Sequence, residues 1–96
     1  FTLDVGHAFM GVRDTNHITR LIEKFKPHLR HVHLHDNLGE KDDHIPLGAG
    51  KIDYRKIVAE LKKQGYDGVI TLEIHCNDQD YLEISRRKLQ QTWSKP

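Results

Sequence analysis

Histidines and carboxylates are concentrated in one short segment near the middle of the chain. Its candidate ligands are His31, His33, His35, Asp36, Asp42, Asp43 and His44. The first three alternate with Val32 and Leu34, and in a strand this period of two places the imidazoles on one face and the aliphatic side chains on the other. Imidazole nitrogens and carboxylate oxygens bind divalent transition metals. The segment therefore predicts a strand that ends in a metal or substrate site.

Two other short apolar runs, at residues 1–5 and 68–74, also carry an acidic residue near their end. Asp4 and Glu73 alternate with aliphatic residues, as His33 does in the central run. Taken singly, Asp4 could be a helix cap, Glu73 a solvated charge, and His33 a hydrogen-bonded histidine. If the three strands are neighbours, the side chains converge, and we expect Asp4, His33 and Glu73 to bind Mn²⁺, Zn²⁺, Co²⁺, Fe²⁺ or Mg²⁺.

Each of these runs is followed by a helical pattern. Apolar residues at i, i+3, i+4 and i+7 predict amphipathic helices after Asp14 or Thr15 and after Asp53, and a thinner stripe predicts a third after Asn77 or Asp78. Residues 7–14 are expected to form a loop, and Gly65 a left-handed helix cap. The chain thus divides into βα units at residues 1–26, 29–64 and 67–93.

Strands that alternate with helices predict an α/β fold with a parallel sheet and right-handed crossovers. Each strand has one aliphatic and one more polar face, whereas a sheet covered by helices on both sides is apolar on both. This favours a (β/α)8 TIM barrel, whose helices cover the outer face and whose active site lies at the carboxyl ends of the strands. Three units are too few to close a barrel. Because the sequence also lacks an initiator methionine, we expect a fragment of a longer protein.

Composition excludes several classes of protein. The 96 residues carry a net charge of +1, which gives no general reason to expect nucleic acid or a membrane surface as partner. No apolar run approaches the length needed to span a bilayer, and the first residues lack the features of a signal peptide. The single cysteine excludes an internal disulfide and fits a reducing compartment, so we expect a cytoplasmic protein.

Several short motifs together resemble the C-terminal part of the xylose-isomerase-like TIM barrels, a superfamily that contains sugar phosphate isomerases and epimerases and endonuclease IV. The matching motifs are Leu3–His7 (LDVGH), His33–Asp36 (HLHD), Asp42–His44 (DDH), Gly48–Asp53 (GAGKID), Gly65–Gly68 (GYDG) and Leu72–Glu73. The resemblance covers nearly the whole chain. It implies that the chain corresponds to the sixth, seventh and eighth βα units of the barrel. It is more specific for the superfamily than for the reaction.

In the isomerase and epimerase members, the positions of Asp4, His33 and Glu73 are metal ligands, and that of His7 contacts substrate. The resemblance implies removal of a proton next to a carbonyl through a metal-stabilised enediolate, with a sugar or sugar phosphate as substrate. Glu73 and His7 are then the catalytic residues. A second catalytic glutamate would lie upstream of this sequence.

The first alternative is an endonuclease IV-like zinc hydrolase that acts on abasic DNA. There, the positions that bind three zinc ions are Asp4, His7, His33, Asp42, His44 and Glu73. Asp43 stands where these nucleases usually have arginine, which removes a cation near a phosphodiester and adds repulsion. His35 stands where they tend to have asparagine. Asp36, with His35, is a further possible ligand of a second metal or of substrate.

The second alternative is a non-catalytic fragment that associates with itself. Three strands leave two open sheet edges, which can pair with another copy or with the remaining strands of a barrel. We therefore expect little catalysis by the isolated chain.

Overall fold

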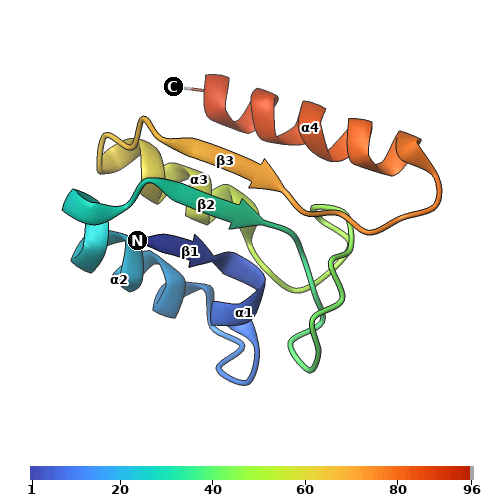
Figure 1. Ribbon diagram of the computed structural model, residues 1–96, viewed down its shortest axis with the longest axis horizontal. Helices are drawn as coiled ribbons and strands as arrows, with labels where there is room; N and C mark the ends of the chain where they lie inside the picture. The colour runs from blue at the N-terminus through green and yellow to red at the C-terminus, as the bar shows by residue number, and fades with distance from the viewer. Residues whose placement is uncertain (96) are drawn as a thin grey trace.

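Strands and helices alternate along the chain, and the strands form one parallel sheet. The computed structural model describes residues 1–95 (Figure 1). In chain order the elements are β1 (Thr2–Asp4), α1 (Val5–Phe9), α2 (Thr15–Phe25), the 3-10 helix η1 (Lys26–His28), β2 (His31–Leu34), α3 (Tyr54–Lys63), β3 (Val69–Leu72) and α4 (Gln79–Ser94). The sheet order is β1-β2-β3, with Asp4 beside His33 and His33 beside Thr71. The predicted α/β fold with parallel strands is confirmed.

The sequence prediction was wrong at the start of the expected loop, because Val5–Phe9 is a helix. The Asp4 side chain caps it by accepting a hydrogen bond from the backbone N–H of His7 at 3.0 Å. Burial of Val5 and Phe9 anchors this five-residue helix against the core. The third strand is also shorter than expected, so that Glu73 lies one residue beyond β3.

The longer helices begin where their capping residues predict. Asp14, Asp53 and Asp78 each accept a hydrogen bond from a backbone N–H in the first turn of α2, α3 and α4, at 2.9, 3.2 and 2.9 Å. Gly65 follows α3 with φ of +72°, a conformation that glycine adopts without strain. These local signals fix the positions of the helices along the chain.

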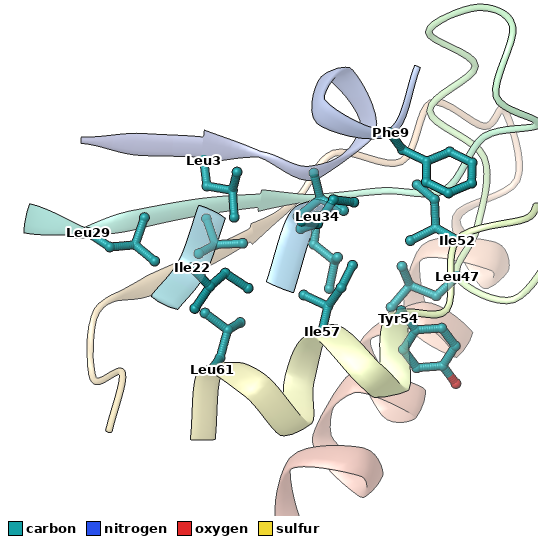
Figure 2. Close-up of a cluster of buried hydrophobic side chains, with 13 residues drawn as sticks. Leu3, Phe9, Ile22, Leu29, Leu34, Leu47, Ile52, Tyr54, Ile57 and Leu61 are labelled. Atoms are coloured by element: carbon teal, nitrogen blue, oxygen red, sulfur yellow. The ribbon is translucent and has the colours of Figure 1, made fainter. Parts of the chain in front are cut away.

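The core lies between the sheet and the helices on one of its faces. Figure 2 shows Leu3 and Leu34 from the strands packed toward Ile22, Ile57 and Leu61 from the helices, all of them buried. Full burial of such a side chain is worth about 1.5–3 kcal/mol. On the opposite face the sheet exposes polar side chains. The helices thus cover a single face, as expected for a piece of a barrel wall.

The helices that the structure describes were also compared with the length and hydropathy of membrane spans. Within residues 1–95, none is both long and apolar enough to cross a bilayer.

Candidate metal centre

The carboxyl ends of the three strands lie at one end of the sheet. In Figure 1 the three arrows point the same way, and the segments that follow them gather at that end. Asp4 is the last residue of β1, His35 follows β2, and Glu73 follows β3. The parallel arrangement brings together side chains that are far apart in the sequence.

Asp4 connects α1 with the residues after β2. Its Oδ1 accepts the N–H of His7 and hydrogen-bonds Nε2 of His35, each at 3.0 Å. Partial burial raises the pKa of Asp4, but the hydrogen bonds to His7 and His35 and the electrostatic attraction of the His35 ring outweigh burial, so its pKa is lowered. Asp4 is therefore held as a carboxylate, which is the form that binds a cation.

The expected trio of metal ligands is only partly assembled. Ligand atoms of Asp4, His35 and Glu73 all lie within 4.8 Å of one another. His33 meets this group through Glu73, with its Nδ1 3.3 Å from Glu73 Oε1. The structure therefore places two imidazoles beside the two carboxylates, where the sequence had led us to expect one.

A second group lies against the first and shares His35. Ligand atoms of His35, Asp42 and His44 lie within 4.8 Å of one another, and Nε2 of His44 is 2.9 Å from Asp42 Oδ2. His7 is at its edge, with Nδ1 3.8 Å from Asp42 Oδ2 and 3.4 Å from Asp4 Oδ2. Asp42 and His44, which the sequence placed in a long loop, thus reach the ends of the strands.

Hydrogen bonds and charge favour the protonated form of His44. Burial lowers its pKa, but the hydrogen bond from Nδ1 to the Glu73 carbonyl at 2.8 Å and the Asp42 carboxylate outweigh burial, so the pKa is raised. The ring is therefore charged to a higher pH than an ordinary histidine.

His75 was not among the residues that the sequence led us to expect in the site. The residue is exposed, but its ring stacks on His44 with 4.1 Å between centroids, and His44 stacks on His35 at 3.9 Å. The backbone N–H of His75 also donates to the His44 carbonyl at 2.9 Å. Its position two residues after Glu73, on the same face of an extended chain, was the signal that could have identified it.

The donor set fits a divalent transition metal. Carboxylate oxygens and imidazole nitrogens are typical ligands of Mn²⁺, Zn²⁺ and Co²⁺. His35 is fully buried, and its Nδ1 is a buried nitrogen without a hydrogen-bond partner among the described residues. Asp36 belongs to neither group, because its two oxygens accept backbone hydrogen bonds beneath the site.

Comparison with known proteins identifies relatives of the same architecture. Residues 1–92 match the family described as Xylose isomerase-like TIM barrel. The crystal structure of a D-tagatose 3-epimerase-like protein superposes with a TM-score of 0.79 and 34% identity, over 96% of this chain and 33% of that one. An uncharacterized protein of Methanocaldococcus jannaschii is 38% identical over 92% of this chain and 33% of its own length.

Two groups of relatives have names that state an activity. Fructoselysine 3-epimerase of Escherichia coli O157:H7 is 35% identical over 54% of this chain and 19% of its own length. Inosose dehydratase of Yersinia enterocolitica is 26% identical over 93% of this chain and 37% of its own length. The chain thus spans about a third of the length of the relatives it matches most fully. The three parallel βα units, the polar strand ends and the match over residues 1–92 show that the chain belongs to the xylose isomerase-like TIM barrel family.

Proposed function

We propose that this chain supplies the metal-binding strand ends of an isomerase or epimerase that acts on a sugar or sugar phosphate. The observation that carries the proposal is the meeting of Asp4 and Glu73 with imidazoles at the carboxyl ends of parallel strands. Relatives named as epimerases favour sugar chemistry over other reactions. Since the match covers only 19% and 33% of the length of these relatives, the proposal concerns a whole protein to which the chain contributes.

Asp4, His33 and Glu73 are the proposed ligands, and His35 holds Asp4. We base the distinction on exposure and on hydrogen bonding: the His33 side chain is 34% exposed, whereas that of His35 is fully buried and its Nε2 already hydrogen-bonds Asp4 Oδ1. A bound divalent ion would supply Lewis acidity, which stabilises negative charge that develops on the oxygens of the sugar.

Glu73 and His7 are proposed to contact the substrate. The Glu73 side chain is 30% exposed, and its carboxylate can accept a proton from the carbon next to the carbonyl when substrate is positioned beside it. The His7 side chain is 64% exposed at the edge of the site and can orient a hydroxyl. The catalytic glutamate expected upstream would complete the pair.

The test combines metal binding with proton exchange. Calorimetric titration with Mn²⁺, Zn²⁺ and Co²⁺ is expected to give about one ion per chain, and Asp4→Asn or Glu73→Gln is expected to abolish binding. Asp78→Asn, which removes a carboxylate that only caps α4, is the matched control and should bind as the wild type does. Incorporation of deuterium next to the carbonyl of ketoses in D₂O, followed by NMR in the whole protein, then reports the reaction. Absence of metal binding by the chain would refute the proposal.

The second metal group keeps one other function open. His35, Asp42 and His44 are arranged so that a further ion could bind beside His7, as a zinc-dependent hydrolase of abasic DNA would require. Binding of more than one ion per chain, with cleavage of an abasic oligonucleotide by the whole protein, would favour this hydrolase over the isomerase.

The open edges of the sheet support a proposal about assembly. Within residues 1–95, β1 and β3 each pair with β2 and with no further strand, and Val69 is 53% exposed. We expect these edges to pair with a second copy or with further barrel strands, and the chain alone to show little catalysis. Gel filtration would reveal association, and turnover of a ketose by the monomer would contradict this expectation.

The free Cys76 is consistent with the cytoplasm as the proposed location.

A further inference from the structure

A buried carboxylate lies two residues after the end of β2, outside both metal groups. Asp36 is 1% exposed. Its Oδ1 accepts the backbone N–H groups of Asn37 at 2.9 Å and Ile52 at 3.0 Å. Its Oδ2 accepts those of Gly48 at 3.0 Å and Gly50 at 2.9 Å. One side chain therefore binds the loop of residues 37–52 near both of its ends.

Backbone dipoles are the partners of this carboxylate. Among the described residues, Asp36 forms no ion pair with a lysine, arginine or histidine. The loop wraps it closely, since a Cβ added at Gly50 would lie 2.4 Å from Asp36 Oδ1 and 2.3 Å from the Asn37 carbonyl. Four N–H donors that converge on a carboxylate form an environment that a neutral side chain cannot satisfy.

The enclosed loop carries two residues of the second metal group. Asp36 and Ile45 exchange backbone hydrogen bonds of 3.0 Å, which places His44 directly beside the strand end. His44 has φ of +52°, a conformation that residues other than glycine keep only when their surroundings fix it. From there it contacts Asp42 and stacks on His35, which holds Asp4.

The neighbouring Asn37 ties the same loop to α1. Its fully buried side chain donates to the Gly6 carbonyl at 3.0 Å and accepts the N–H of Gly39 at 2.8 Å. On the other side, Leu47 donates its N–H to the buried Ser85 of α4. The loop is thus connected to elements on either side of the site, with the Asp36 carboxylate at its base.

We propose that Asp36 is a positioning residue that fixes the loop of residues 37–52. It thereby keeps Asp42 and His44 in contact with His35 at the metal site. It acts through backbone amides and touches neither metal nor substrate. This inference rests on the proposed metal-dependent function only in its consequence for metal affinity, because the hold on the loop can be measured without any metal.

The test is Asp36→Asn, which keeps the shape of the side chain. The carboxamide replaces one oxygen with an NH₂ group, so two of the four N–H groups face a donor instead of an acceptor. In the metal-free protein, we expect hydrogen exchange at Gly48, Gly50 and Ile52 to become at least about tenfold faster, the change that corresponds to one lost hydrogen bond. Affinity for Co²⁺, measured by its visible spectrum, is expected to fall about 10- to 100-fold.

Asp53→Asn is the matched control. It removes a negative charge at the end of the same loop, but this carboxylate only caps α3 through the N–H of Lys56. It should leave Co²⁺ affinity and exchange at Gly48 and Gly50 unchanged. Faster exchange in Asp36→Asn with unchanged Co²⁺ affinity would overturn the positioning role, and so would unchanged exchange.

Two further results separate this inference from the proposed function. If the wild-type protein binds no Co²⁺, the proposed function fails, and exchange alone decides whether Asp36 fixes the loop. If Asp36→Asn does not fold, hydrogen exchange in the wild-type protein still tests the proposal. A loop that Asp36 holds in place should protect the amides of Gly48, Gly50 and Ile52 as well as the sheet protects those of β2. Exchange faster than in β2 would overturn the proposal.

Discussion

Replacement of Gly6 by alanine tests how tightly the site is packed. Gly6 is buried in α1, and a Cβ there would lie 1.8 Å from Cε1 of His35 and 2.5 Å from its Nδ1. To reach an ordinary contact of 3.4 Å, the ring must retreat by about 1.6 Å. It is fully buried, stacks on His44 and hydrogen-bonds Asp4, so such a shift breaks contacts that hold the site together.

The expected cost of Gly6→Ala can be estimated from these contacts. Overpacking of a filled interior costs about 1–3 kcal/mol. Loss of the hydrogen bond between His35 and Asp4 adds about 1–2 kcal/mol. Alanine is favoured over glycine in a helix by about 1 kcal/mol, which offsets part of this. We therefore expect the free energy of unfolding to fall by about 1–4 kcal/mol.

Urea unfolding of the metal-free chain, followed by circular dichroism, measures this change. The control is a double-mutant cycle with His35→Ala, which removes the obstructing ring. In that background Gly6→Ala should cost little or should stabilise the chain. A cost below about 0.5 kcal/mol in the wild-type background, or equal costs in both backgrounds, would refute the packing argument.

Three further predictions concern the core, a helix cap and pH. Leu34→Ala removes a fully buried side chain and should lower the free energy of unfolding by about 2–5 kcal/mol in urea. Asp14→Ala removes the acceptor for the Asn16 N–H and should cost about 1 kcal/mol in the same assay. Because the pKa of His44 is raised on folding, its contribution to stability is complete below the unfolded pKa of 6.5 and is lost as pH rises through the folded value. Urea titrations of the metal-free chain should therefore show a loss of stability as the pH rises above 6.5, and this loss should be absent in His44→Asn.

The order of elements could be predicted from the sequence because its signals are local, whereas the family was predicted from the resemblance of several short motifs. The apolar stripe that contains Ile57 and Leu61 has the period of a helix, and Asp53 caps that helix through an N–H three residues away. The alternation around His33 likewise predicts a strand with one polar face. Such features depend on backbone geometry over a few residues, which the local sequence specifies.

The composition of the site could be predicted only in part. Asp4 and Glu73 were expected at neighbouring strand ends, and the structure brings them within 4.8 Å of a shared imidazole. That this imidazole belongs to His35 follows from the glycine at position 6, which leaves room for the ring. Gly6 and His35 are distant in sequence, and no local pattern indicates that they meet.

Only the tertiary structure separates the residues that can bind a metal from those that hold the site together. In the sequence, Asp36 and Asp42 are two carboxylates in one loop. In the structure, Asp36 is buried among backbone amides, whereas the Asp42 carboxylate faces His44. The physical reason is that the role of a carboxylate depends on which donors and charges surround it, and three of the four donors to Asp36 come from residues 12 to 16 positions away that the fold brings to it.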